Sequence, residues 1–581
     1  MLNINNLKRL IIKATHWFVI PMIAALMVMW PSVQSGLERL QPDYGDVLFN
    51  LYLFEHVFQH FTSLDIFNPA LFWSPDFYWP VANVYTWSDH LLGPSVLYAP
   101  WRLLFNPFES YLGWTITTLT LNYISIRWAL TKIAKYSNPI FLSAIALTAT
   151  FNPVVTVQIS HPQMLSLYIF GPLLILWHEA LSKSTEQFSI ARLILLLSLT
   201  LLNSIFNIYL AVYGAFCTLS VLIVHIATRV SQKNYKAKSG SRLKYSLALL
   251  MTTISAATYI YLPYLRAMST FGERSNEQII ENLPKAASWL HSTTNLLLKA
   301  PYGIDFLQSN PNIIYGQEQS LFPGWFFLIT FTYSSIILFT KKAKLHSHIS
   351  KSSKSRWFFV SVFLMLATIN CYGLSLWTLI MNIIPGASAL RASSRVAIII
   401  IIFSSGFLAL SSEEWDLRLN LKARTDEIFN LLVFLLSFLS IWIISSPSFS
   451  LNAWRLQTER LATRLKNYPQ CNVFWLSKSL KEPWARHIQA MHISFMTGIP
   501  TVNGVSGHSP KGGWPSEDPS MLQANAWIQK VTHSSIHQVI NSEKPQYTLC
   551  EINDVDAHSA RIKSIEGNIH KLSKTQRLHQ Q

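Results

Sequence analysis

The stretch from 394 to 411 reads SRVAIIIIIFSSGFLALS, and it decides the class of this chain. No charged residue occurs between Arg395 and Ser411. A helix needs about 20 predominantly apolar residues to cross a hydrocarbon core of about 30 Å. The stretch therefore predicts a membrane-crossing helix.

Similar apolar runs recur through the first three quarters of the chain. Of its 581 residues 50% are hydrophobic and only 13% are charged, and the mean hydropathy is +0.27, outside the balance of an ordinary soluble domain. The sequence predicts a mainly α-helical, polytopic transmembrane bundle of roughly eleven spans. The runs lie near 15 to 30, 110 to 131, 139 to 158, 163 to 181, 191 to 206, 208 to 229, 245 to 265, 322 to 340, 357 to 374, 394 to 411 and 428 to 446.

Lysine and arginine residues indicate the orientation, because short cytoplasmic loops retain positive charge. Most basic clusters fall inside if the amino terminus is cytoplasmic and if 91 to 105 forms a surface or re-entrant helix that does not cross. The first span, preceded by Lys8, Arg9 and Lys13, has no small-residue cleavage site after it and is expected to be a retained anchor. The net charge of +17 then suits membrane lipid and predicts no nucleic-acid partner.

Four regions follow from this topology: a tail and first span (1 to 30), a first outer loop (31 to 106), a helical bundle (107 to 446) with an outer loop at 266 to 321, and an outer domain (447 to 581). The last region has short apolar runs typical of buried strands, which predicts a small extracytoplasmic α/β domain. It contains Cys471 and Cys550. They form either a disulfide or two buried thiols, since an oxidising compartment permits a bridge without requiring it.

The first outer loop concentrates carboxylates. Within it, 46 to 61 has apolar residues at helical spacing and predicts a helix lying on the membrane. A partly desolvated Asp46 would serve as a general base for an acceptor hydroxyl or would hold a metal, with Asp43 sharing that role. Alternatively, Asp46 only satisfies the first turn of the helix. The acids of this loop are Glu38, Asp43, Asp46, Glu55, Asp65, Asp76 and Asp89.

Two histidines in the same segment raise the question of a metal. His56 and His60 are four residues apart, so they share a helix face and suit a divalent ion together with Asp46 or Asp89. The alternative is that they fill a polar interface. Farther along, Asp89 and His90 lie in an aromatic-rich run that suits either a sugar-stacking cleft wall or an aromatic belt.

Two arginines stand on the outer side, against the positive-inside trend. Arg391 and Arg395 are four residues apart in the segment PGASALRASSR (385 to 395). Guanidinium groups grip phosphate oxygens bidentately, which favours a lipid phosphate as their partner. The alternative is pairing with carboxylates of the first loop.

These residues together resemble a family, the bacterial multi-pass glycosyltransferases of the C-type (GT-C) fold, which use polyprenyl-phosphate-linked sugars. The resemblance spans nearly the whole chain and rests on the order of several short motifs. They are Gly45-Asp46 with Asn50, SDHLLG (88 to 93), HPQ (161 to 163), GQEQSLFPG (316 to 324), the 385 to 395 segment and PTVNGVSG (500 to 507).

The resemblance implies a transferase of the bacterial cytoplasmic membrane that acts on its outer face. Asp46 corresponds to the acid such enzymes use as base, and Arg391 and Arg395 lie near the donor phosphate. The acceptor is an envelope lipid, glycan or protein. The acid motif differs from its commonest form, because two residues instead of one separate Asp43 from Asp46. Residues expected to contact substrate are Asp89, His90, His161, Glu318, Arg391, Arg395 and Asn503.

Two other classes of function remain open. A transporter or flippase shares polytopic architecture, although ion-coupled transporters keep ionisable groups near the bilayer centre and the apolar runs here have few. A non-catalytic envelope assembly protein would keep the fold and make the carboxylates dispensable.

Overall fold

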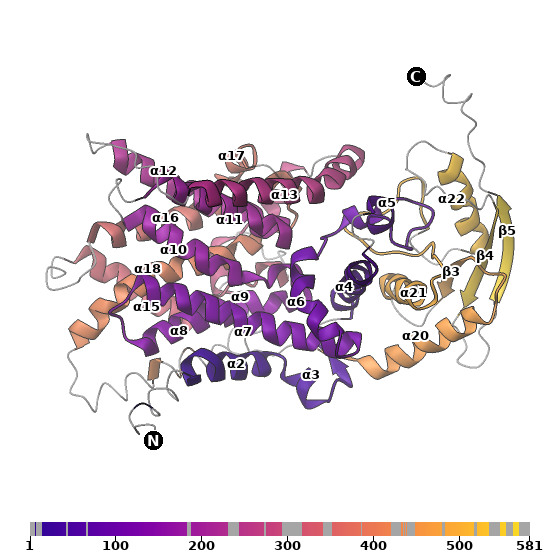
Figure 1. Cartoon of the computed structure of the whole chain (residues 1–581), viewed down its shortest axis with the longest axis horizontal. Helices are drawn as coiled ribbons and strands as arrows, with labels where there is room; N and C mark the ends of the chain where they lie inside the picture. The colour runs from indigo at the N-terminus through magenta and orange to yellow at the C-terminus, as the bar shows by residue number, and fades with distance from the viewer. Residues whose placement is uncertain are drawn as a thin grey trace. The chain divides into compact units, whose positions relative to one another are not determined.

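The computed structural model describes residues 6, 14–41, 44–64, 68–182, 188–230, 243–271, 275–292, 317–340, 351–384, 386–419, 432, 433, 435, 437, 448–478, 483–515, 520–533, 546–553 and 562–568 (Figure 1). The chain forms two compact units. Unit 1 comprises Met1–Val33, Leu112–Ile260 and Gly272–Ser446. Unit 2 comprises Gln34–Tyr111, Tyr261–Phe271 and Pro447–Gln581.

Unit 1 is helical. Short 3-10 and π segments (η) interrupt its α-helices. Three of its helices, α3, α7 and α13, have one end assigned to unit 2. The elements are η1 (Thr15–Val19), α2 (Ile20–Val28), α3 (Trp30–Gln34), α7 (Pro107–Ile133), α8 (Pro139–Phe151), α9 (Pro153–Thr156), η4 (Val157–Ser160), η5 (Pro162–Met164), η6 (Leu167–Ile169), α10 (Phe170–Ser182), α11 (Ile190–Phe206), α12 (Ile208–Val230), α13 (Leu243–Phe271), α14 (Asn276–Glu281), η7 (Ala286–Leu290), η9 (Gln317–Gln319), α15 (Trp325–Phe339), α16 (Lys351–Thr368), α17 (Trp377–Met381), η10 (Ala387–Ala389), η11 (Ser393–Arg395) and α18 (Val396–Leu419).

Helix α18 is the central helix of unit 1. Its apolar window is buried on all sides, as expected for a helix that is hydrophobic all round. It packs against α8, α10, α12, α15 and α16. At the contact with α16, a Cβ on Gly406 would lie 2.6 Å from the ring of Trp357, so only glycine permits this close approach.

Among the described residues, five helices are long and apolar enough to cross a membrane, as expected for a membrane protein. They span Pro139–Ser160, Pro162–Ser182, Ile208–Thr228, Lys244–Phe271 and Ser393–Trp415. Shorter apolar helices at Thr15–Val28, Ile190–Phe206 and Trp325–Phe339 coincide with three more predicted runs. The run at 428 to 446 lies almost entirely outside the described residues, so the total of eleven stays a prediction.

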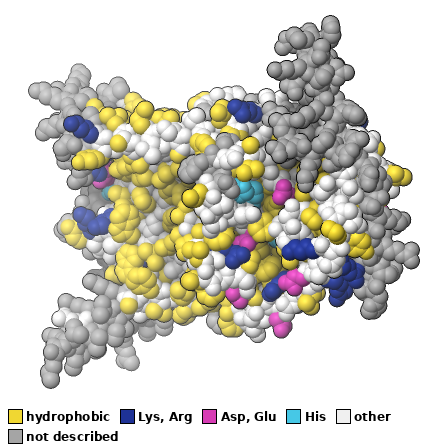
Figure 2. All heavy atoms as spheres, turned by 45° about the vertical axis from the view of Figure 1, so that its right-hand side comes forward, with side chains coloured by type: hydrophobic (Ala, Val, Ile, Leu, Met, Phe, Trp, Pro, Cys, Tyr) yellow, Lys and Arg dark blue, Asp and Glu magenta, His cyan; other side chains and the backbone are white. Residues whose placement is uncertain are grey.

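The surface of unit 1 is suited to lipid. Ile223 and Ile226 of α12, and Leu247, Met251 and Ile254 of α13, expose their side chains. Figure 2 shows hydrophobic side chains covering much of the described surface, with few charged side chains among them. Because water disfavours large apolar patches, this surface fits contact with acyl chains.

Unit 2 joins the first outer loop to the C-terminal region, which the sequence predicted as separate domains. Strand β1 (Arg39–Leu40) pairs antiparallel with β2 (Phe449–Ser450). Its other elements are α4 (Asp46–Ser63), α5 (Pro69–Phe72), η3 (Val84–Trp87), α6 (Leu92–Arg102), α20 (Leu451–Lys466), β3 (Val473–Lys478), α21 (Pro483–Thr497), α22 (Met521–His533), β4 (Gln546–Asn553) and β5 (Ile562–Asn568).

The C-terminal region contains a three-stranded sheet in the order β3-β4-β5. Strands β3 and β4 are parallel and β4 and β5 antiparallel, and α21 and α22 pack against the sheet. A parallel pair needs a crossover connection, which the segment containing α21 and α22 supplies. The expectation of a small α/β domain agrees with this topology.

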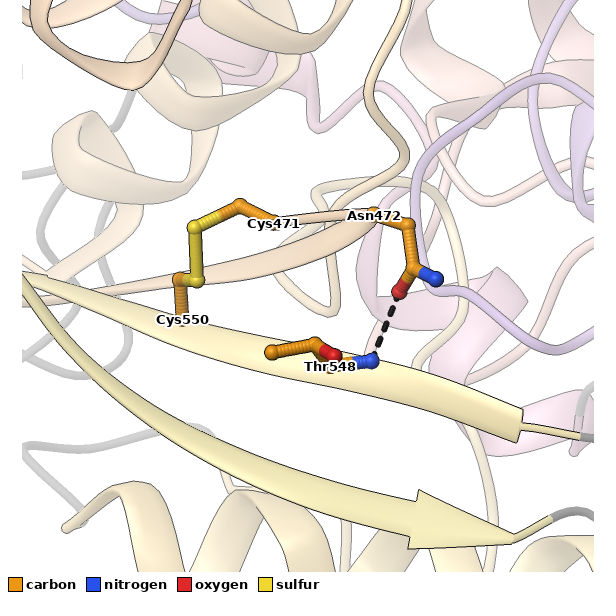
Figure 3. The surroundings of a disulfide bond; sticks show 4 residues. All are labelled: Cys471, Asn472, Thr548 and Cys550. Carbon is orange, nitrogen blue, oxygen red and sulfur yellow. Dashed lines mark hydrogen bonds between the residues drawn. A yellow bond between two sulfur atoms is a disulfide. The ribbon is translucent and has the colours of Figure 1, made fainter. Parts of the chain in front are cut away.

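A disulfide joins the segment just before β3 to strand β4. It links Cys471 to Cys550, whose Cα atoms are 5.8 Å apart (Figure 3). Beside it, the backbone N–H of Thr548 donates to the side-chain oxygen of Asn472 at 2.7 Å. Of the two alternatives that the sequence left open, the structure has the bridge.

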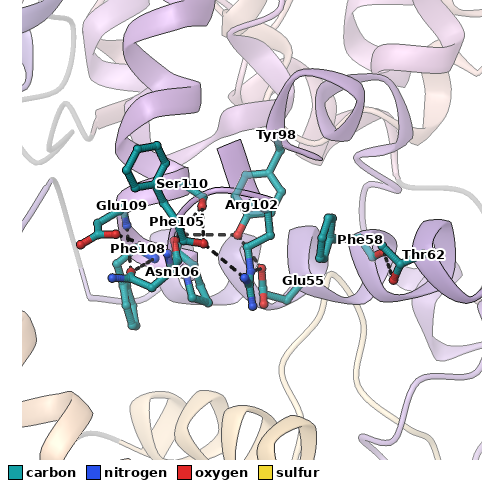
Figure 4. A network of polar contacts seen from close by, with 11 residues as sticks. Glu55, Phe58, Thr62, Tyr98, Arg102, Phe105, Asn106, Phe108, Glu109 and Ser110 are labelled. Atoms are coloured by element: carbon teal, nitrogen blue, oxygen red, sulfur yellow. Dashed lines mark hydrogen bonds and ion pairs between the residues drawn. The ribbon is translucent and has the colours of Figure 1, made fainter. Parts of the chain in front are cut away.

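Helix α4 begins at Asp46, as the sequence predicted, but it does not present one apolar face to a membrane. Residues 47 to 57 are all buried, and α4 packs against α6 and α21 within unit 2. The buried Glu55 accepts hydrogen bonds from Tyr98 at 2.6 Å and Arg102 at 2.7 Å (Figure 4). This network fixes α4 to α6. Helix α6 has 11 residues, too short to cross a bilayer, in agreement with the prediction for 91 to 105.

Candidate functional site

An ion pair between Arg395 and Glu318 is the centre of the candidate site in unit 1. Arg395 donates from Nε to Oε2 of Glu318 at 3.1 Å and from Nη2 to Oε1 at 2.5 Å. The arginine side chain is 4% exposed and the glutamate side chain 28%. The bidentate geometry therefore joins a buried cation to a partly accessible anion.

Hydrogen bonds of neighbouring residues position both members of the pair. Arg395 ends η11, and the neighbouring Ser394 N–H donates to the carbonyl of Asn282 at 2.9 Å. Glu318 lies in η9, where the adjacent Gln319 accepts a hydrogen bond from Ser288 at 2.6 Å. The segment 275–292 thus anchors η9 and η11, which explains how residues 77 positions apart meet.

Two tyrosines of α12 hold the arginine segment from the other side. The Tyr213 hydroxyl donates to the carbonyl of Ala392 at 3.1 Å. The Arg395 guanidinium lies over the ring of Tyr209, 5.3 Å from its centroid. A cation over an aromatic face is stabilised electrostatically, and the ring excludes water from that side.

Arg391 and His161 complete the group. The Arg391 side chain is exposed, and His161 is partly exposed between two spans. Burial lowers the pKa of His161 well below its ordinary value, and the charges of Arg395 and Arg391 lower it further. The imidazole is therefore neutral near pH 7, so the two arginines are the cations that attract an anion.

Two hydroxyl groups next to Arg395 are further hydrogen-bonding groups of the site. The side chains of Ser393 and Ser394 are fully buried, and neither hydroxyl has a hydrogen-bond partner among the described residues. A buried hydroxyl without a partner is costly unless a ligand or water satisfies it. Guanidinium and hydroxyl groups in one segment are suited to oxygens of an anion such as phosphate.

The structure thus brings together four residues that the sequence proposed separately, namely His161, Glu318, Arg391 and Arg395. Glu318, and not a first-loop carboxylate, is the ion-pair partner of Arg395.

Unit 2 contains the predicted base. Asp46 is exposed at the first position of α4, and its carbonyl accepts a hydrogen bond from the Asn50 side chain at 2.8 Å. The ring of Trp484 lies against the preceding Gly45, where a Cβ would be 2.8 Å from it. Trp484 is itself 43% exposed, so a carboxyl group and an aromatic ring are both accessible here. Asp43 lies outside the described residues.

The SDHLLG motif (88 to 93) begins α6. His90 is buried, and its Nδ1 accepts from the backbone N–H of Leu92 at 3.2 Å. The Tyr264 hydroxyl donates to the carbonyl of Ser88 at 2.6 Å, and the Asp89 charge acts on the same tyrosine. His90 thus has a structural role at the helix start, while Asp89 is partly exposed.

Asn503 has its amide saturated inside unit 2. It is fully buried, accepts from the Leu476 N–H at 2.8 Å and donates to the Leu476 carbonyl at 3.2 Å and to His487 Nδ1 at 3.0 Å. These contacts fix β3 to the loop at 501 to 503. A structural role explains Asn503, and the substrate contact expected for it stays a prediction without support from this geometry.

His56 and His60 are neighbours, with ring centroids 4.3 Å apart. His56 is buried, and its Nε2 is 2.9 Å from the carbonyl oxygen of Phe72, to which it donates. That hydrogen bond fixes the tautomer of His56 and leaves Nδ1 as the nitrogen with a lone pair. Among the described residues, no group of three or more histidine, cysteine, aspartate or glutamate side chains is arranged to hold a metal.

The His56 environment makes stability depend on pH. Burial lowers the pKa of His56 to about 3, His60 adds to the effect, and the Phe72 contact opposes it. The unfolded chain, with an ordinary pKa near ~6.5, binds a proton that the folded chain rejects between these values. Stability should therefore fall as pH drops below about 6.5, by up to about 1.4 kcal/mol per unit for this group.

Thermal unfolding of the purified chain from pH 7.5 to 4.5 measures this dependence. His56→Gln retains a donor for Phe72 without the titration, so its melting temperature should fall less steeply with acid. Equal slopes for the two proteins would contradict the assignment.

Asp76 is an acidic residue of the first loop for which the sequence predicts no role. Although its side chain reaches the surface, the surrounding protein removes enough water to raise its pKa, and His60 opposes the change. Carboxyl groups with raised pKa values are candidates for acid–base roles. No sequence pattern gave this signal, since it depends on the folded surroundings.

The chain was compared with protein-family models and with curated proteins. No family model matches the chain, and no curated protein matches it.

Proposed function

We propose that this protein is a membrane glycosyltransferase that moves a sugar from a polyprenyl-phosphate donor to an envelope lipid, glycan or protein acceptor. The observation that carries the proposal is the group formed by Arg395, Arg391 and Glu318 with the neutral His161. One buried and one exposed arginine beside a membrane suit a lipid phosphate, because guanidinium donors match its oxygens.

The bond between the sugar C1 and the phosphate oxygen breaks, and its electron pair stays on the phosphate. Arg395 and Arg391 stabilise that charge. The acceptor oxygen bonds to C1, and its proton passes to a general base, the role that the resemblance gives to Asp46. Atoms and charge balance without a further reactant.

Mass spectrometry of lipid-linked sugars and envelope glycans tests the proposal. The comparison includes cells with the wild-type chain, cells without it, and cells with Asp46→Asn. We expect the deletion and Asp46→Asn to lose the same glycan and to accumulate the same polyprenyl-phosphate sugar. The mass difference then identifies the sugar.

Glu38→Gln is the matched control, since Glu38 is another exposed carboxylate of the first loop. It should behave as wild type. If Asp46→Asn matches wild type while the deletion shifts the profile, Asp46 is structural and transport or scaffolding is the better account.

A further inference from the structure

The group of Arg391, Arg395, Glu318 and His161 in unit 1 has a net charge that is informative about the ligand. Arg391 and Arg395 contribute two positive charges, Glu318 one negative charge, and His161 none near neutral pH. Counted over these four side chains, the group carries one positive charge. Without Glu318 it would carry two.

The two lipid phosphates of a glycosyl transfer differ in charge. A polyprenyl-phosphate sugar is a phosphodiester with one negative charge. The polyprenyl phosphate left after transfer is a monoester, which carries about −1.5 to −2 at pH 7. A group with one positive charge forms a neutral complex with the diester, whereas its complex with the monoester has a net negative charge.

We propose that Glu318 is a specificity-determining residue that weakens binding of a phosphomonoester lipid to the arginine group more than it weakens binding of a phosphodiester lipid. This inference rests on the proposed function. Glu318 is a fixed anion that competes for Arg395. It therefore weakens the binding of every phosphate, in proportion to the charge of that phosphate. Its effect is to promote release of the monoester product and leave the group available for the next donor.

The geometry supports competition through charge. Glu318 takes the Nε and Nη2 edge of the guanidinium, and Nη1 makes no hydrogen bond among the described residues. A phosphate at the free end therefore shares the same cation with the carboxylate. The two anions repel each other across a buried guanidinium, where screening by water is weak.

Binding measurements on the full-length protein in lipid nanodiscs test the inference. The probes are a polyprenyl monophosphate and its methyl phosphodiester, measured at pH 7.5 with wild type and Glu318→Gln. Loss of one negative charge should tighten diester binding about ten-fold and monoester binding about a hundred-fold, since the energy scales with ligand charge. The ratio of diester affinity to monoester affinity should fall about ten-fold.

Two control variants separate the causes. Glu318→Asp keeps the charge and should keep the wild-type ratio of diester affinity to monoester affinity. Glu459→Gln removes a glutamate from an exposed ion pair with Arg455 in unit 2 and should change neither affinity. If Glu318 only supported the fold, its replacement would weaken the binding of both ligands equally.

The outcomes distinguish this inference from the proposed function. Glu318→Gln could leave the ratio of the two affinities unchanged while Arg395→Gln still weakens binding. In that case the selectivity role of Glu318 is wrong, and the assignment of the arginine group as a phosphate-binding site is retained. If wild type binds neither probe, the donor-phosphate assignment fails as well.

Discussion

Replacing Arg395 with glutamine should weaken binding of a polyprenyl phosphodiester about a hundred-fold, the largest effect expected of any single substitution in this chain. The variant loses the charge-assisted donor at the Nη1 end of the guanidinium. It also leaves Glu318, now without its cation, beside the incoming phosphate. Both changes act in the same direction, because an unpaired carboxylate repels the anion.

A double-mutant cycle apportions these two contributions. Arg395→Gln combined with Glu318→Gln should bind more tightly than Arg395→Gln alone, since the repulsion is removed. Arg395→Lys keeps the charge without the fork and should fall between wild type and Arg395→Gln. The measurement is probe binding in nanodiscs, with thermal unfolding of each variant as the check on folding. Wild-type affinity in folded Arg395→Gln would refute the role of this arginine.

Removing the disulfide should produce the largest loss of stability. The bridge between Cys471 and Cys550 closes a loop with a sequence separation of 79. Breaking a native bridge typically costs about 2–5 kcal/mol, because the reduced unfolded chain gains conformational freedom. Both sulfurs also belong to the core formed with residues such as Phe474 and Ile493. Replacing both cysteines with serine adds the cost of burying hydroxyl groups.

Chemical denaturation of the full-length protein, followed by tryptophan fluorescence, measures the effect. Cys371→Ser is the control, because Cys371 is an exposed free cysteine. It should leave the transition unchanged. Mass analysis after alkylation without reductant should show Cys471 and Cys550 unmodified. Alkylation of both in the folded protein would show that the bridge is absent.

Local pattern in the sequence determined the elements. Unbroken apolar runs predicted the helices, and the run at 394 to 411 became α18 (Val396–Leu419). Helical spacing placed the start of α4 at Asp46, and two short apolar runs coincide with β3 and β4. These predictions succeed because helix and strand periodicity depends on residues a few positions apart.

Local pattern misjudged α4, however. Its spacing suggested one apolar face on a membrane, whereas its first three turns are buried all round. Glu55 and His56 are polar in sequence, yet hydrogen bonds to Tyr98 and Phe72 satisfy them inside the protein. Burial depends on partners that lie far along the chain, and periodicity does not contain that information.

The sequence by itself determined a mainly helical chain, with several helices apolar enough to cross a membrane and a small α/β region, and it singled out the two arginines as cations in need of a partner. Only the tertiary structure decided that this partner is Glu318, that Cys471 bonds to Cys550, and that the first outer loop folds together with the C-terminal region. The physical reason is the range of the interactions. Hydrophobic periodicity is encoded in neighbouring residues, whereas ion pairs, disulfides and domain contacts depend on segments that folding brings together.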